Sequence, residues 1–97
     1  MGNMQAQQEQ MQAELEKITV SADAGDGAIK VDATANRVIT NISIDPEKLD
    51  LNDHEELEDL LLTAINRVLE RAQAEEAKHA QEMISKMMPG LGGMFGQ

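Results

Sequence analysis

The chain has no cysteine, tryptophan or tyrosine, and its single phenylalanine, Phe95, lies near the C-terminus. The absence of cysteine excludes disulfides, thiol nucleophiles and cysteine-ligated zinc or iron–sulfur centres. The scarcity of aromatic side chains leaves the core of these 97 residues to leucine, isoleucine, valine, alanine and methionine. A chain of this size buries only a modest core by itself. We therefore expect a second chain to contribute to burial.

Positive charge is also scarce, because 8 lysines and arginines stand against 18 aspartates and glutamates, giving a formal net charge of −10. Charge alone disfavours a nucleic-acid partner, since phosphate neutralisation is the main sequence-independent attraction to DNA. No apolar run is long enough to span a bilayer. The first residues, MGNMQAQQEQMQ, lack the charged-then-apolar plan of a signal peptide. We expect a soluble, cytoplasmic protein with no membrane partner.

The first part of the chain has the composition of a helix. Residues 3–17 contain neither glycine nor proline and are rich in good helix formers. The apolar residues of this segment, together with Ile18 just after it, form a narrow stripe of coiled-coil type. The members of this stripe are Met4, Met11, Leu15 and Ile18. The alternative for this glutamine-rich stretch is disorder.

The next segment, residues 18–44, alternates apolar and polar residues and predicts three antiparallel strands with one apolar face. The first turn, AGDG, supplies Gly25 and Gly27, which tolerate the positive φ of a tight hairpin. The second turn, TANR, carries Asn36, the residue we expect in the left-handed conformation. The third strand, VITNISID, is expected to place Val38, Thr40, Ile42 and Ile44 on one face.

A long helix is predicted to follow the third strand. Asp45-Pro46 ends the strand, because proline has no N–H for the ladder. Asn52 or Asp53 has the spacing of a capping box, and Pro89-Gly90 is a stop signal. A helix over 53–88 would be about 54 Å long. A compact domain of this size has a radius of gyration of about 12–13 Å, so the helix must overhang its own domain.

The long helix carries two apolar segments. The first can cover the sheet, and it consists of Leu57, Leu61, Ile65, Val68 and Ala72. The second has little left in the same chain to bury it, and it consists of Met83, Ile84 and Met87. We expect another chain to stabilise this overhang. The fold is therefore predicted to be α+β, with one domain over 1–88 and a flexible glycine-rich tail over 89–97.

Catalytic chemistry finds little support in the sequence. His79 has Glu75 and Glu82 one turn away on either side, a spacing that could hold a divalent cation. We favour ordinary salt-bridging on an exposed helix, and we expect no metal. No Ser/His/Asp or paired-carboxylate arrangement can be placed. The prediction is a protein that is not an enzyme, with no cofactor and no small-molecule substrate.

The basic residues that do occur are unevenly distributed. Arg67, Arg71 and Lys78 fall within about 40° of one another around the long helix. Glu70, Glu75 and Glu82 stand at spacings that allow ion pairs with these cations, which is the alternative interpretation. Without aromatic residues in the folded part, recognition of single strands is not expected. The residues alone favour an adaptor or structural dimer over a nucleic-acid-binding protein.

The order of these segments resembles the YbaB/EbfC family of bacterial nucleoid-associated proteins. The resemblance rests on MQAQQEQMQAELEKI, GAIKVDATANRVITNISIDPEKL, HEELEDLLLTAINRVLERAQ and the tail MMPGLGGMFGQ, and so covers nearly the entire chain. No single motif is specific, whereas their order and spacing are. The second turn of the family usually contains glycine, which TANR lacks.

The resemblance implies an α-β-β-β-α fold and a tweezer-like homodimer whose helical arms project from a central sheet body. It also implies duplex DNA binding with no or relaxed sequence preference, in nucleoid organisation or gene regulation. The family has no signature contact motif, so the candidate DNA-binding residues come from charge geometry. They are Arg67, Arg71, Lys78, Lys17, Lys30 and Arg37. The alternative is a non-enzymatic protein-interaction dimer without direct DNA binding.

Overall fold

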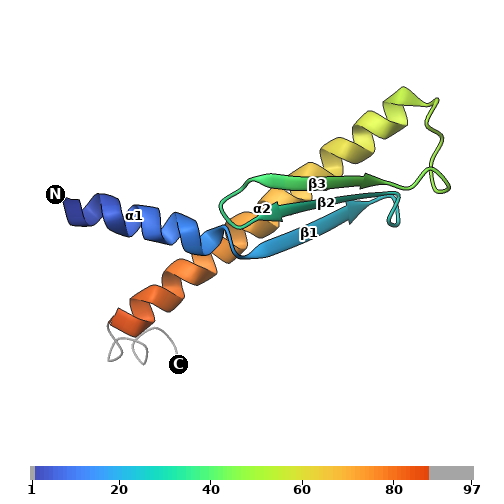
Figure 1. The fold of residues 1–97 in the computed structure, drawn as a ribbon. Helices are drawn as coiled ribbons and strands as arrows, with labels where there is room; N and C mark the ends of the chain where they lie inside the picture. Colours follow the sequence, from blue (N-terminus) through green and yellow to red (C-terminus); the bar gives the residue numbers. More distant parts are fainter. Residues whose placement is uncertain (1, 88–97) are drawn as a thin grey trace.

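A computed structural model describes residues 2–87 of the chain. Its elements follow in the order α1 (Gly2–Leu15), β1 (Thr19–Ala24), β2 (Ile29–Thr34), β3 (Ile39–Ile44) and α2 (His54–Met87) (Figure 1). The predicted α-β-β-β-α order is therefore confirmed. The tail expected over 89–97 and the last residue of the expected helix, Met88, lie outside the described residues.

The three strands form one antiparallel sheet in the order β1-β2-β3, so that β1 and β3 are its two edges. The register places Ala22, Val31 and Ile42 side by side across the sheet. In the first turn, Gly25 has φ of 66° and Gly27 has φ of 87°, as the sequence predicts. A Cβ atom on Gly25 would also come within 3.2 Å of Leu60. Glycine at this position thus serves both the turn and the close approach of α2.

The second turn differs from the prediction. Arg37, with φ of 66°, takes the left-handed conformation, and Asn36 does not. The loop has three residues between Thr34 and Val38, because the Thr34 N–H donates to the Val38 carbonyl at 2.9 Å. Such loops combine a type I turn with a left-handed residue that follows it. The Arg37 N–H donates to the Thr34 carbonyl at 2.9 Å and closes the type I turn. In a loop of this length the third residue, Arg37, must therefore take the left-handed conformation.

The third strand also departs from the prediction. Ile39 lies opposite Ala33, and Ile42 lies opposite Val31, with a register shift between these pairs. One extra residue in β3 is accommodated by this bulge, which reverses the alternation on one side of it. Ile39 therefore shares the face of Ile42 and Ile44 in place of the expected Val38 and Thr40. This face is the one that α2 covers on the neighbouring strands.

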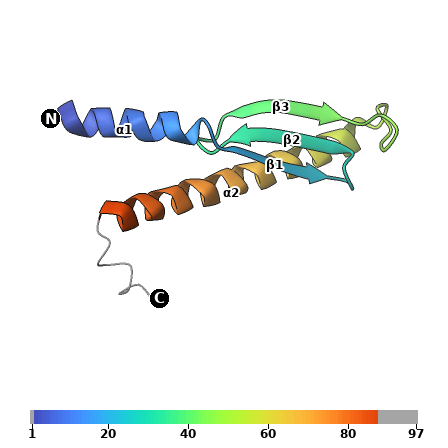
Figure 2. The same cartoon turned by 60° about the horizontal axis from the view of Figure 1, so that its bottom comes forward.

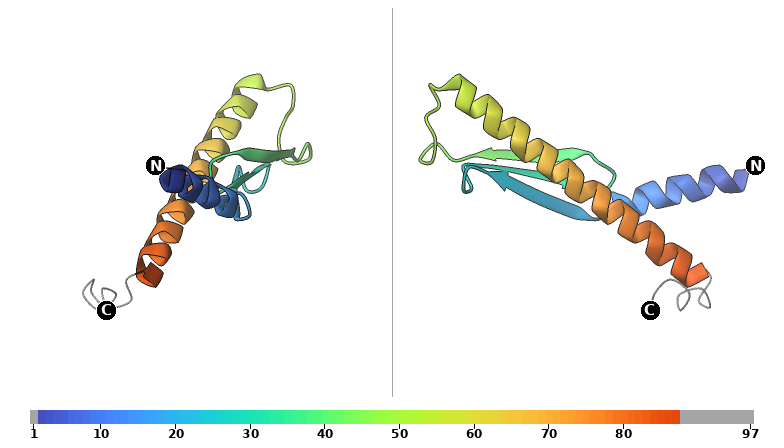
Figure 3. Two further views of the ribbon diagram at one scale, coloured as in Figure 1. Left: turned by 60° about the vertical axis from the view of Figure 1, so that its left-hand side comes forward. Right: turned by 180° about the vertical axis from the view of Figure 1, so that it is seen from behind.

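Helix α2 begins as predicted. The Asp53 carboxylate caps it by accepting the Glu56 N–H at 3.1 Å. The helix has 34 residues and is about 51 Å long. It lies diagonally across one face of the sheet, where it packs against β1 and β2 (Figures 2 and 3). Its C-terminal part then continues past the sheet and diverges from α1, as Figure 3 shows.

The molecule is elongated as a result. Its radius of gyration is 17.9 Å, and its extents are 56 × 34 × 17 Å. A compact chain of this length would have a radius of about 12–13 Å. The predicted overhang of α2 is therefore confirmed, and Ile84 and Met87 on the overhanging part are exposed.

The core is small and rich in alanine. Of its twelve buried apolar residues, seven are alanines, and the largest fully buried side chains are Leu15, Ile29, Val31 and Val68. Small side chains such as Ala64 and Ala72 let α2 approach the sheet closely. The consequence is that several larger aliphatic residues remain outside this core. They include Ile39, Ile42, Ile44 and Leu62.

Candidate nucleic-acid interface

Two of the predicted basic residues lie against the outer edge of β1. From α2, Arg67 Nη1 donates to the Asp23 carbonyl at 2.8 Å, and Arg71 Nη1 donates to the Ser21 carbonyl. Both arginines remain exposed. Their spacing of one helical turn matches the two-residue spacing of the carbonyls along the strand. The side of α2 that carries these cations is therefore turned toward β1.

A third predicted residue joins them from the sheet. Lys30 of β2 lies opposite Asp23 of β1. Lys30 and Arg71 line the same surface hollow of about 290 Å³, together with Ser21, Ala22, Asp23 and Gly27. We refer to Arg67, Arg71 and Lys30 as the β1-edge cluster. The fold thus gathers three cations that lie up to 41 positions apart in the sequence.

The acidic groups beside the β1-edge cluster hydrogen-bond to other protein groups. Asp23 Oδ2 accepts the Gly27 N–H at 3.1 Å, and Asp32 Oδ1 accepts the Ser21 hydroxyl at 2.6 Å. Within residues 2–87, the side-chain contacts between a carboxylate and an arginine, lysine or histidine are the Arg37–Glu76 ion pair and the His79–Glu14 hydrogen bond. The alternative interpretation, in which Glu70, Glu75 and Glu82 pair with Arg67, Arg71 and Lys78, therefore differs from the observed contacts. The two arginines bind main-chain oxygens instead.

The other three predicted residues lie apart from the β1-edge cluster. Arg37, in the β2–β3 turn, contacts Glu76 at 3.4 Å between Nη2 and Oε1. Lys17 lies in the turn after α1. Lys78 lies further along α2 and borders a second hollow with Gln81, Glu82, Ser85 and Lys86. Lys86 was not among the predicted residues. The sequence could have pointed to it, because it lies on the same helix as Lys78.

His79 has a different partner from the one its helical neighbours suggest. Its Nε2 lies 2.6 Å from Glu14 Oε1, so that the ring connects α2 to α1. Both side chains are partly buried at this contact. Over the described residues, no group of three histidine, aspartate or glutamate side chains gathers as a metal site would require. The observed role of His79 is thus to join the two helices where they diverge.

The net charge of −10 is concentrated at one end of the molecule. Residues 45–59, in the connection after β3 and the first turns of α2, hold eight acidic side chains and one lysine, Lys48. This segment accounts for −7 of the net charge, and the rest of the chain carries only −3. The β1-edge cluster belongs to that second, nearly balanced part. A strongly acidic chain can therefore still present a local basic surface.

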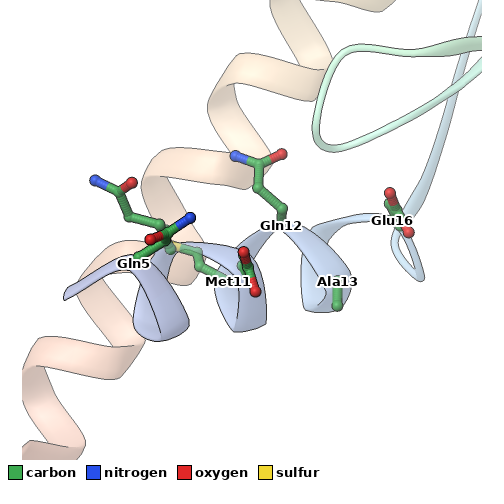
Figure 4. Close-up of a pocket in the computed structure, with 7 residues that line it drawn as sticks. Gln5, Met11, Gln12, Ala13 and Glu16 are labelled. Carbon is green, nitrogen blue, oxygen red and sulfur yellow. The ribbon is translucent and has the colours of Figure 1, made fainter. Parts of the chain in front are cut away.

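A further hollow lies on the surface of α1. Figure 4 shows Gln5, Met11, Gln12, Ala13 and Glu16 around it. Its lining is mostly amide and apolar, and within residues 2–87 it brings no histidine or basic side chain beside its carboxylates. No described helix is long and apolar enough to cross a membrane.

Comparison with known proteins gives a consistent result. The family model of the YbaB/EbfC DNA-binding family matches residues 1–88. A protein named "Nucleoid-associated protein" from Acetivibrio thermocellus is 45% identical over 93 residues, covering 96% of this chain and 79% of that protein. One of the same name from Chloroflexus aggregans is 40% identical, covering 95% of this chain and 88% of that protein. The resemblance found in the sequence is confirmed.

The fold also has a counterpart among solved structures. The crystal structure of the uncharacterized protein HP0035 from Helicobacter pylori superposes with a TM-score of 0.67. The two chains are 18% identical, and the match covers 84% of this chain and 95% of that one. At this identity the likeness extends to the fold alone.

Proposed function

Because the chain belongs to the YbaB/EbfC DNA-binding family, we propose that it binds duplex DNA as a homodimer with little or no dependence on base sequence. The observation that carries this proposal is the β1-edge cluster, in which side chains from α2 and β2 meet at one exposed hollow. Its role would be in nucleoid organisation or gene regulation, and the name "Nucleoid-associated protein" of its relatives supports a place at the nucleoid.

The β1-edge cluster is suited to phosphate groups. A guanidinium carries five N–H donors in a planar fork. Arg67 and Arg71 each use one terminal nitrogen on a main-chain carbonyl, so other donors remain for phosphate oxygens. The main-chain contact also holds each arginine in place before DNA arrives. Lys30 adds a third positive charge beside Arg71, with which it lines the hollow.

The chemistry of this surface favours backbone contact over base recognition. Contacts to phosphates position a protein on DNA but carry no direct sequence information. The open face of the sheet is polar and its side chains are short, apart from Lys30. Lys78 and Lys86 continue the basic character along the arm of α2. We infer a binding mode that follows the DNA backbone.

The homodimer is supported by the uncovered half of the sheet. Ile39, Ile42 and Ile44 are 36–44% exposed, whereas Ile29 and Val31 on the adjacent strand are fully buried beneath α2. A second copy would cover these isoleucines with its own, since a two-fold interface joins the same patch on both subunits. The larger aliphatic side chains that the alanine-rich core leaves out would then be buried between chains.

A single substitution tests the DNA-binding surface. Lys30→Gln removes one cation from the β1-edge cluster and leaves both arginine contacts intact. We expect weaker binding to two unrelated duplexes alike, and a log–log salt slope that falls by about 0.9 for each phosphate that the protein no longer neutralises. The comparison variant is Lys48→Gln, which removes the one cation of the acidic segment. Lys48 Nζ already donates to the Asp26 carbonyl at 3.1 Å, so we expect a smaller loss of affinity than from Lys30→Gln.

Two results would count against the proposal. Equal reductions in affinity from Lys30→Gln and Lys48→Gln would place the effect in net charge rather than in this surface. A folded dimer that binds no duplex at low salt would favour the alternative, a protein-interaction dimer without DNA. A strong preference for one of the two duplexes would contradict the backbone mode.

A further inference from the structure

The two edge strands differ in how their backbone groups are covered. An edge strand presents a row of N–H and C=O groups, which is a template on which another chain can add a strand. Along such a strand, every second residue directs these groups away from the sheet. Ser21 and Asp23 of β1 are two residues apart, and both carbonyls accept hydrogen bonds from arginines of α2. The outer side of β1 is therefore occupied.

The outer side of β3 has no comparable cover. Over the described chain, no side chain hydrogen-bonds to the backbone of Ile39–Ile44, whereas Arg67 and Arg71 do so on β1. Helix α2 packs on β1 and β2 and leaves β3 to one side. All six residues of β3 are exposed. The sheet is thus open to addition at one edge only.

We propose that Arg67 and Arg71 end the sheet at β1, so that chains associate through β3 and assembly stops at two copies. If both edges were open, β3–β3 contacts and β1–β1 contacts would alternate, and the assembly would have no natural end. The arginines prevent the second contact in two ways. They occupy the outward carbonyls, and their charges repel the same charges on another copy, a known means of protecting edge strands.

This proposal goes beyond DNA binding and does not depend on it. Only the association through β3 and the number two rest on the proposed homodimer. The function it assigns to Arg67 and Arg71 is an interaction surface kept closed, in addition to any phosphate contact. It also explains why these side chains contact main-chain oxygens although acidic residues such as Glu70 and Glu75 lie within reach along the same helix.

The test uses the full chain with the double substitution R67M/R71M. Methionine keeps helix propensity and an unbranched stem, and it removes both guanidinium groups. The matched control is K78M/K86M, which changes two cations further along the same helix, around a separate hollow, to methionine. Light scattering after size exclusion measures the mass over a hundredfold range of concentration, in the absence of DNA.

We expect the wild-type chain and K78M/K86M to keep the mass of two chains. R67M/R71M should form species of four or more chains that grow with concentration. Amide exchange at Ser21 and Asp23 should slow in these larger species, because their outward N–H groups would pair with a second β1. R67M/R71M that is folded by circular dichroism and keeps the wild-type mass throughout would overturn the proposal.

Two further outcomes remain decisive. If R67M/R71M does not fold, R67A/R71A is measured, since alanine has the highest helix propensity and also removes both guanidinium groups. Larger species from R67A/R71A would support the proposal, and wild-type mass at the highest concentration would overturn it. If the wild-type chain is a single copy and R67M/R71M forms pairs, β1 is closed by the arginines as proposed, and the homodimer is wrong.

Discussion

On the β1 side of the sheet, α2 covers the apolar face and its arginines occupy the outward carbonyls, whereas on the β3 side both the face and the edge are uncovered. The difference is visible in one pair of neighbours. Val31 is fully buried, and Ile42, directly opposite on the next strand, is 44% exposed. Residues of the same kind on the same face are thus buried within the single chain on one side and exposed on the other.

The largest effect should come from breaking the covered side. Val31→Asp would bury a charge without a partner beneath α2, which costs roughly 3–5 kcal/mol. Because a chain with so small a core has little stability to spare, we expect Val31→Asp to be unfolded at room temperature. Circular dichroism during urea titration measures this. A native spectrum with an unchanged midpoint would contradict the position of the core.

Ile42→Asp makes the same chemical change on the uncovered side. Here we expect the chain to stay folded and the dimer to dissociate, because the new carboxylate is solvated in one chain and buried only between two. Light scattering should report one chain at concentrations where the wild type has two. A variant that remains dimeric would place the dimer contact elsewhere, away from β3.

The basic surface can be weakened without altering either face of the sheet. Changing Arg67, Arg71 and Lys78 to glutamine should lower the log–log salt slope of DNA binding by about 0.9 for each phosphate that these cations neutralise. The charge-preserving pair R67K/R71K should retain most of that slope, since lysine can still meet a phosphate. Titrations at four salt concentrations distinguish the two. Equal slopes for the wild type and the glutamine variant would assign the DNA contact to the remaining candidates, Lys17, Lys30 and Arg37.

The smallest effect concerns the start of α2, on which the covered side depends. Asp53→Ala removes the side chain that accepts the Glu56 N–H and should cost about 1 kcal/mol of unfolding free energy. Asn52→Ala, one residue earlier, should cost less, because the Asn52 side chain makes no bond to the first turn within the described chain. Urea denaturation of both variants checks the order. A larger effect from Asn52→Ala would show that Asn52, and not Asp53, caps the helix.

Local features of the fold could be predicted from the sequence, because the residues that determine them lie within a few positions of one another. Gly25 and Gly27 predict the first hairpin. Asn52 or Asp53 predicts the start of α2, and Asp53 is the observed cap. The left-handed residue in the second turn was not predictable from residue preference, since loop closure between Thr34 and Val38 selects Arg37. The sequence did not predict the bulge in β3, because the alternation of Val38 and Thr40 with their neighbours fits a regular strand as well as a bulged one.

The candidate site depended on contacts between distant parts of the chain. Helical geometry correctly placed Arg67 and Arg71 on one side of α2. It could not show that Ser21 and Asp23 would accept their hydrogen bonds, because these residues come from a strand 44 and 50 positions away. The meeting of Lys30 with Arg71 has the same origin. Spacing along a helix predicts partners within that helix, such as Glu70. The observed partners of Arg67 and Arg71 lie on β1 and follow only from the packing of α2 on the sheet.

The unbroken course of α2 has a mechanical consequence. Beyond Ala72, its last buried residue, the helix continues to Met87 over about 22 Å, which makes it a lever with its fulcrum on the sheet. A rotation of about 10° at the fulcrum would move the tip by about 4 Å without bending the helix. The contact of His79 with Glu14 joins α2 to α1 about 10 Å beyond Ala72, nearly halfway along this overhang. Small adjustments among the alanines beneath the helix would therefore be magnified into the span between its tip and the far end of α1.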